Sequence, residues 1–222
     1  EGIRLVVGTP EGKMEIRSPL IGRHNAYNIL GAVGVALHEG VPKEQIVRGI
    51  ESLKSVPGRL ERVDEGQNFA VLVDYAHTDD ALKNVLSALR HLAKKRIITL
   101  FGCGGNRDKD KREKMAKVAV ALSDYVVITS DNPRNEDPQA IIDDIEKGIP
   151  TEEKGELGKM QGGRHTAICD RRLAIEHGLD SAQKGDIVLI AGKGHEEYQI
   201  IGDEKIHFDD REVARNFLRS TV

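Results

Sequence analysis

Apolar and polar positions divide the chain into two regions. In the first, alternating residues predict short strands over 3–7 and 14–17, joined by turn-type residues at 9–12. Apolar residues at helical spacing predict helices over 25–39 and 42–53, the second opening at Pro42 and carrying Ile46, Ile50 and Leu53 on its apolar face. The run Ser55-Val-Pro-Gly58 then breaks the pattern. We therefore expect two domains, residues 1–56 and residues 57–222.

The second region alternates strands and helices. Continuous apolar runs predict strands over 70–74, 96–101, 125–129 and 186–191, and amphipathic stretches predict helices over 79–92 and 111–122, from 137 and from 171. This alternation is typical of an α/β fold with a mainly parallel sheet covered by helices on both faces. Residues 198–201 and 205–208 flank Gly202-Asp203 and predict a C-terminal β-hairpin, followed by a helix over 209–218. The polar, glycine-rich residues 149–163 predict a surface excursion.

Composition narrows the class of protein. The net charge of -3 and the pI near 6.3 give no basic excess for nucleic acid or anionic membrane, and the chain has four Phe, four Tyr and no Trp for stacking bases. No apolar run approaches the roughly 20 residues that cross a bilayer, and the N-terminus is not a secretion signal. Cys103 and Cys169 form no CxxC pair and have no histidine at zinc-ligand spacing. We expect two reduced thiols in a cytoplasmic protein.

Polar loops follow four of the predicted strands. They are Asp74-Tyr-Ala-His77, the glycine-rich segment 102–109, Ser130-Asp-Asn-Pro-Arg134 and Gly192-Lys-Gly-His-Glu196. In an open parallel sheet, ligands bind beyond the carboxyl ends of the strands. We therefore predict that the four loops face one edge and share a pocket.

Each loop also has an ordinary structural interpretation. Gly-Cys-Gly-Gly at 102–105 is a common turn composition, Asp131-Asn132-Pro133 fits an Asx turn, and His77 and His195 can be ordinary loop histidines. The charged run 108–112 fits a solvated helix start. Four such loops at equivalent positions in the topology favour a binding site over four unrelated turns.

The charges in these loops indicate a small ligand that bears both carboxylates and amines. Arg107 and Arg134 offer planar donors that suit carboxylates, and Asp131 and Glu196 can hold an ammonium group. The backbone at Gly192 can approach a ligand closely because glycine has no Cβ. A purely anionic phosphate ligand would not need acidic groups so near.

Residues 8–14 are similar to a phosphate-binding P-loop but depart from it. Three residues instead of four separate Gly8 from Gly12, and Met14 stands where a P-loop needs a hydroxyl for magnesium. We interpret this segment as a hairpin turn. An unrelated Rossmann oxidoreductase is disfavoured, because Asp74-Tyr-Ala-His77 stands where the G-x-G-x-x-G fingerprint would follow the first strand.

Five ordered motifs together resemble the Mur ligase family, in its diaminopimelate-adding type. They are Arg23-His-Asn-Ala-Tyr-Asn28, Pro57-Gly-Arg-Leu-Glu61, Asp74-Tyr-Ala-His77-Thr, Asp131-Asn-Pro-Arg134 and Ala191-Gly-Lys-Gly-His-Glu196. The resemblance covers essentially the whole chain. It implies the end of a central α/β ATPase domain in residues 1–56 and a Rossmann-like C-terminal domain in residues 57–222.

The resemblance also implies a reaction. Such ligases use ATP and Mg²⁺ to convert a carboxylate of UDP-N-acetylmuramoyl-L-alanyl-D-glutamate into an acyl phosphate, which the amine of meso-2,6-diaminopimelate attacks during peptidoglycan synthesis. The P-loop, the carboxylated lysine and the UDP-substrate domain of the family are not in this chain. We therefore expect a fragment that lacks the N-terminal domains of the enzyme and is inactive as a ligase alone.

The matched motifs carry expected roles for single residues. The resemblance implies ATP contacts by Asn28, Arg59, Asp74 and His77. It implies diaminopimelate contacts by Arg107, Asp131, Asn132, Pro133, Arg134, Gly192 and Glu196. Arg134 is expected to discriminate, because its guanidinium can bind the carboxylate that diaminopimelate has and lysine lacks. The alternatives are a lysine-adding ligase of the same family and, for this chain alone, a non-catalytic amino-acid- or nucleotide-binding module.

Overall fold

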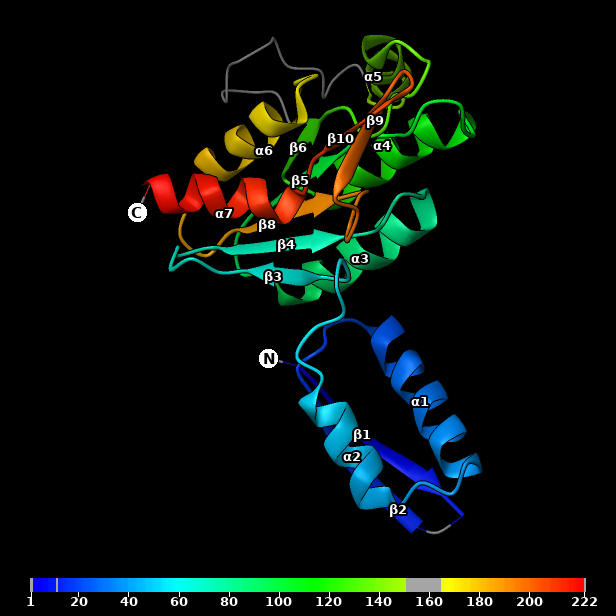
Figure 1. The fold of residues 1–222 in the computed structure, drawn as a ribbon. Coiled ribbons are helices and arrows are strands. Elements are labelled where there is room, and N and C mark those ends of the chain that lie inside the picture. Colours follow the sequence, from blue (N-terminus) through cyan, green and yellow to red (C-terminus); the bar gives the residue numbers. More distant parts are fainter. Residues whose placement is uncertain (1, 11, 151–164, 222) are drawn as a thin grey trace. The chain divides into compact units, whose positions relative to one another are not determined.

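The computed structural model describes residues 2–10, 12–150 and 165–221 and divides the chain into two compact units, Glu1–Val56 and Pro57–Val222 (Figure 1). The division falls within the turn-forming run at 55–58. Among the residues that the structure describes, no helix has the length and apolar character needed to span a membrane.

The unit Glu1–Val56 contains a hairpin and two helices. Strands β1 (Ile3–Thr9) and β2 (Gly12–Ser18) pair antiparallel with Thr9 opposite Gly12, so the segment similar to a P-loop is a hairpin turn, as predicted. Helices α1 (Arg23–His38) and α2 (Lys43–Ser52) follow. The buried core of this unit consists of Met14, Ile16, Ile29, Val33 and Ile46.

Two details of α2 differ from the sequence prediction. Pro42 has φ -58° and ψ 140°, which is extended backbone, so it lies at the N-cap and not at the first helical position. Leu53 was expected on the apolar face but is 46 % exposed, because the helix ends at Ser52 and Leu53 already has extended backbone.

The unit Pro57–Val222 is built on a six-stranded sheet. The strand order is β3 (Glu61–Val63), β4 (Ala70–Asp74), β8 (Ile187–Ala191), β5 (Ile97–Phe101), β6 (Tyr125–Ile128) and β7 (His165–Ala167). All neighbouring pairs are parallel except the edge pair β3–β4. This confirms the predicted mainly parallel α/β sheet.

Helices cover both faces of this sheet (Figure 1). On one face lie α6 (Arg171–Asp180) and α7 (Asp210–Thr221), and on the other lie α3 (Asp79–Leu92) and α4 (Asp110–Leu122), with α5 (Pro138–Glu146) beside α4. Side chains alternate between the faces along each strand. The hydrophobic core between the sheet and helices α6 and α7 includes Val71, Val73, Ile98, Leu100, Ile175 and Val213.

The sequence missed two strands of this sheet. Strands β3 and β7 have only three residues each, too few to show a periodic pattern. The predicted C-terminal hairpin is present as β9 (Tyr198–Ile201) and β10 (Glu204–His207). Of the predicted surface excursion at 149–163, residues 151–163 lie outside the described residues, and Ile149 is buried.

Candidate functional site

The four predicted loops meet at the carboxyl edge of the parallel strands. The N–H of Gly192, after β8, donates to the carbonyl of Asp74, at the end of β4, over 3.0 Å. The N–H of Gly105, after β5, donates to the carbonyl of Asn132, after β6, over 2.9 Å. The structure therefore places the four loops together, whereas their ligand contacts remain predictions.

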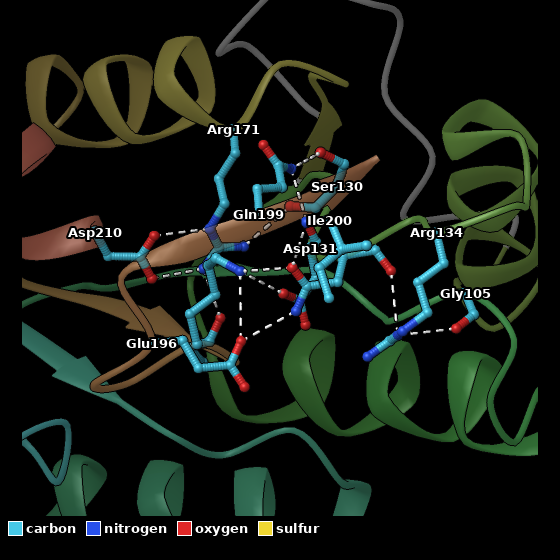
Figure 2. Close-up of polar contacts among 12 residues, drawn as sticks. Gly105, Ser130, Asp131, Arg134, Arg171, Glu196, Gln199, Ile200 and Asp210 are labelled. Atoms are coloured by element: carbon cyan, nitrogen blue, oxygen red, sulfur yellow. Dashed lines mark hydrogen bonds and ion pairs between the residues drawn. The ribbon is translucent and has the colours of Figure 1, made fainter. Parts of the chain in front are cut away.

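A buried ammonium lies among three of the predicted diaminopimelate contacts. Lys193 is 0 % exposed, and its Nζ lies 3.2 Å from Asp131 Oδ1, 3.0 Å from Asn132 Oδ1 and 3.6 Å from Glu196 Oε2. Figure 2 labels Asp131 and Glu196. The Asn132 amide donates to Glu196 Oε2 over 3.0 Å. We predicted that Asp131 and Glu196 hold the ammonium of a ligand, but the ammonium between them here belongs to Lys193.

Arg134 has a backbone conformation that is uncommon for a residue with a side chain. Its φ is 53°, in the left-handed region. The β9–β10 hairpin holds it there: the Arg134 N–H donates to the Ile200 carbonyl over 3.0 Å, and the N–H of Gly202, in the hairpin turn, donates to the Arg134 carbonyl over 2.7 Å. Nη1 of Arg134 donates to the Gly105 carbonyl over 2.9 Å, so the guanidinium lies across the loop that follows β5 (Figure 2).

A second buried side chain, Gln199 of β9, supports the same loop. Its amide donates to Ser130 Oγ over 2.9 Å and to the Asp131 carbonyl over 2.7 Å (Figure 2). The Ile200 N–H donates to Asn132 Oδ1 over 3.0 Å. Strand β9 is therefore hydrogen-bonded to the loop Ser130–Arg134, which carries predicted diaminopimelate contacts, as well as to β10.

Arg107 differs from these residues because it is exposed. Among the residues that the structure describes, it makes neither a hydrogen bond nor an ion pair. Its guanidinium and that of half-buried Arg134 belong to loops that are joined at Gly105. Among the described residues of this edge, Arg107 is thus a guanidinium without a hydrogen bond or ion pair and Arg134 is one that is partly satisfied, and both have planar donor geometry.

The Arg171–Asp210 ion pair lies beneath these loops. Arg171 donates to both carboxylate oxygens of Asp210 over 2.8 Å, and both side chains are fully buried (Figure 2). Arg171 also donates to the carbonyls of Ser130 and Ala191 over 3.1 Å each. Because these carbonyls lie at the ends of two different strands, one side chain fixes the start of two loops of the site.

The residues expected at the phosphate and ribose of ATP also lie in this unit. Arg59 lies 5.1 Å from the centre of the Tyr75 ring, a cation–π distance, and His77 Nδ1 lies 2.8 Å from the Tyr75 carbonyl. Asp74 is 2 % exposed, and its two oxygens each accept a backbone N–H, from Leu60 and from Ala76, over 2.8 Å. Asp74 therefore fixes the local backbone, and its contact with a nucleotide remains a prediction.

Tyr75 joins the loops that carry the expected ATP contacts to the loop after β8. Its ring lies 4.6 Å from the His77 ring and 5.3 Å from the His195 ring. Burial, and then the charge of Glu196, raise the pKa of Tyr75, which keeps its hydroxyl neutral. The sequence offered Tyr75 only as part of a motif, without a role.

Asn28, expected at the adenine, is an exposed residue of α1 in the unit Glu1–Val56. Its amide donates to Asn25 Oδ1 over 3.2 Å. Its place beside the other expected ATP contacts remains a prediction.

The charged run 108–112 is only partly a solvated helix start. Asp108 and Lys109 are exposed, but Arg112 is 1 % exposed and donates to Glu136 and to Asp144 over 2.9 Å each. That interpretation is wrong for Arg112, which ties α4 to the segment after Arg134 and to α5.

A family model described as "Mur ligase, glutamate ligase domain" matches residues 58–194, more than half of the chain. A protein of Solibacter usitatus, named UDP-N-acetylmuramoyl-L-alanyl-D-glutamate--2,6-diaminopimelate ligase, is 50 % identical over 219 residues, which cover 99 % of this chain and 42 % of that protein. A protein of the same name from Geobacillus kaustophilus is 48 % identical over 97 % of this chain and 44 % of its own length. The chain thus spans less than half the length of these relatives.

Solved structures agree with this similarity. A structure with the same ligase name superposes with a TM-score of 0.69 at 37 % identity, covering 98 % of this chain and 43 % of that one. A folylpolyglutamate synthase of Mycobacterium tuberculosis superposes with a TM-score of 0.67 at 19 % identity, covering 99 % of this chain and 45 % of that one, and so shares the fold. With its sheet, its ordered motifs and the family match over residues 58–194, the chain belongs to the Mur ligase family.

Proposed function

We propose that this chain is the amino-acid-binding part of a cytoplasmic, ATP-dependent ligase that adds meso-2,6-diaminopimelate to UDP-N-acetylmuramoyl-L-alanyl-D-glutamate in peptidoglycan synthesis. Relatives of about 50 % identity carry this name. The observation that carries the proposal is one loop edge with two guanidinium groups, Arg107 and Arg134, beside the acidic pair Asp131 and Glu196. We assign residues 1–56 to the end of the ATP-binding domain and residues 57–222 to the C-terminal domain.

The charges of this edge match diaminopimelate. The ligand has two carboxylates, for which Arg107 and Arg134 are suitable partners. It has two amines, of which the attacking one must be uncharged when it reacts. The other remains an ammonium, and Asp131, Glu196 and Lys193 together carry one net negative charge to hold it. Gly192 and Pro133 complete the loops at this edge, with Gly192 at φ 115°, where a side chain would be strained.

The proposed reaction joins the acceptor amine to an activated carboxylate. ATP phosphorylates the carboxylate of the UDP-muramoyl dipeptide, the amine nitrogen then attacks the acyl carbon, and the C–O bond to phosphate breaks as phosphate leaves and the amine loses a proton. The role of this chain is to hold and orient the amine, which converts a bimolecular encounter into a positioned attack. Asn28, Arg59, Asp74 and His77 are proposed to complete the ATP site of the longer enzyme.

Mg²⁺ is proposed to accompany ATP. In the parts of the chain that the structure describes, no three His, Cys, Asp or Glu side chains gather as a metal site. We propose that the main ligands of the ion lie outside this chain, and we derive no step through it.

Calorimetry with meso-diaminopimelate and L-lysine tests the proposal. The 222-residue chain should bind diaminopimelate more tightly than lysine, and Arg134→Ala should remove most of that preference, because losing one partner of a charge pair that ligand binding desolvates costs about 2–5 kcal/mol. Arg172→Ala, an exposed arginine on α6, is the matched control. Lysine bound as tightly as diaminopimelate would favour a lysine-adding ligase, and equal losses of both ligands in Arg134→Ala would make Arg134 structural.

A further inference from the structure

Lys193 is a fully buried cation to which the proposed reaction gives no task. Its Nζ lies within 3.6 Å of oxygens on three of the predicted diaminopimelate contacts, Asp131, Asn132 and Glu196. An ammonium is costly to bury unless it is paired, so an enclosed lysine needs acceptors such as these. The three acceptors in turn depend on Lys193 for their arrangement.

The orientation of the Asn132 amide follows from two donors, Lys193 and the Ile200 N–H. Asn132 Oδ1 accepts hydrogen bonds from Lys193 Nζ over 3.0 Å and from the Ile200 N–H over 3.0 Å. Its amide nitrogen must therefore point the other way, and it donates to Glu196 Oε2 over 3.0 Å. Lys193 thus helps the Ile200 N–H to hold the amide, and it acts on Glu196 Oε2 both through that amide and directly over 3.6 Å.

Lys193 also separates two carboxylates. Asp131 Oδ1 and Glu196 Oε2 lie 3.2 Å and 3.6 Å from the same nitrogen. Without that cation, two negative charges would face each other in a poorly solvated place, where like charges repel strongly. Glu196, whose side chain is 18 % exposed against 10 % for Asp131, is the one that can swing away toward solvent.

We propose that Lys193 is a positioning residue of the amino-acid site. It holds Asn132 and Glu196 in the arrangement that receives the ligand ammonium, and it leaves the cluster with a single net negative charge. It has no exposed surface with which to touch the ligand, so it acts through its neighbours. This inference rests on the proposed function, because it assumes that the cluster binds the ammonium of diaminopimelate.

A double-mutant cycle tests the inference. The 222-residue chain, Lys193→Met, Glu196→Gln and the double variant are titrated with meso-diaminopimelate in a calorimeter. Lys193→Met keeps the stem and removes the charge, and it should weaken binding by about tenfold or more, as expected when one partner of a buried charge pair is lost. Because Lys193 acts through Glu196, the double variant should bind diaminopimelate within about threefold of the weaker single variant. If the two residues acted independently, their losses of binding free energy would add.

The matched control is Lys205→Met. Lys205 is an exposed lysine of β10 whose Nζ lies 3.8 Å from the centre of the Tyr198 ring, and Lys193 lies 5.7 Å from the same ring. This control should bind diaminopimelate as the unmodified chain does. Thermal unfolding of each variant is followed by circular dichroism. If Lys193→Met does not fold, Lys193→Gln, which keeps a donor without the charge, takes its place with the same expectation.

The outcomes separate this inference from the proposed function. If Lys193→Met binds within about threefold of the unmodified chain or more tightly, the inference is overturned. Tighter binding would mean that Lys193 competes with the ligand for the carboxylates. If Lys193→Met binds diaminopimelate normally but Arg134→Ala loses the preference for diaminopimelate over lysine, the inference about Lys193 fails and the proposed function stands. An unmodified chain that binds no diaminopimelate would overturn both.

Discussion

The Arg171–Asp210 ion pair can be removed by replacing one partner or both, and the two changes have different expected costs. Arg171 makes four hydrogen bonds, two to Asp210 and one each to the carbonyls of Ser130 and Ala191. Arg171→Met leaves a fully buried carboxylate without its cation. Loss of one partner of a buried pair costs about 3–5 kcal/mol, whereas replacing both partners by apolar residues of similar size is often close to neutral.

We therefore expect Arg171→Met to lower the free energy of unfolding by about 3–5 kcal/mol, and Arg171→Met with Asp210→Leu to cost less than Arg171→Met alone. At about 2–4 °C per kcal/mol for a unit of this size, the single variant should unfold roughly 6–20 °C below the unmodified chain. Both variants leave the Ser130 and Ala191 carbonyls without this donor, so the double variant keeps that share of the cost and lacks only the share of the uncompensated carboxylate.

Thermal unfolding followed by circular dichroism measures these differences, with Arg172→Met on the exposed side of α6 as the control. A loss below about 1 kcal/mol in Arg171→Met would contradict the argument, since it would place the pair among weak surface interactions. A double variant that costs the sum of the two single variants would also contradict it, because the two side chains would then act independently.

Three further predictions concern single residues. A Cβ at Gly105 would lie 1.9 Å from the Pro133 carbonyl oxygen, so Gly105→Ala should destabilise the chain by about 2 kcal/mol or more in urea unfolding. Burial raises the pKa of Cys103 to about 12 and also raises the pKa of half-buried Cys169. Iodoacetamide at pH 8 should therefore modify Cys169 of the folded chain before Cys103, which should stay unmodified, as measured by mass spectrometry. The Asn106 N–H and the buried Arg112 guanidinium lower the pKa of Glu136 from 4.5. The ionised Glu136 carboxylate therefore stabilises the fold above that value, and this contribution is lost as the pH falls through the lower folded pKa. The difference in free energy of unfolding between the unmodified chain and Glu136→Gln should shrink below about pH 4 in acid unfolding.

The elements of the fold were largely readable from the sequence because their signals are local. Strands such as Ala70–Asp74 and Ile187–Ala191 are continuous apolar runs, and the helices between them show helical spacing. Parallel strands then place their carboxyl ends, and the polar loops after them, at one edge. Strands β3 and β7 escaped prediction because three residues carry no periodicity, and β3 pairs antiparallel at the edge of an otherwise parallel sheet.

The pairing of charges in the site could not be read in the same way. Arg171 and Asp210 are 39 residues apart, and Lys193 lies 62 residues from Asp131, so only the folded chain shows that they meet. Nothing in the sequence indicated that Lys193, in a glycine-rich loop, is buried. Its ammonium lies between Asp131 and Glu196, the carboxylates that we had predicted to hold a ligand ammonium. Sequence spacing identifies which charges gather at an edge, but tertiary packing decides which of them neutralise one another.

The charged groups of the site fall into two sets with different consequences for specificity. Lys193 is already satisfied within the fold, whereas Arg107 has no partner among the described residues and Arg134 is only partly satisfied. In the proposed function, a ligand without a second carboxylate would leave half-buried Arg134 unpaired on binding, and we propose that rejection of such ligands rests on that penalty. The penalty requires Arg134 to stay in place, and its left-handed backbone is held by hydrogen bonds to β9. In the proposed function, selection of the acceptor therefore depends on the β9–β10 hairpin as much as on the Asp-Asn-Pro-Arg motif.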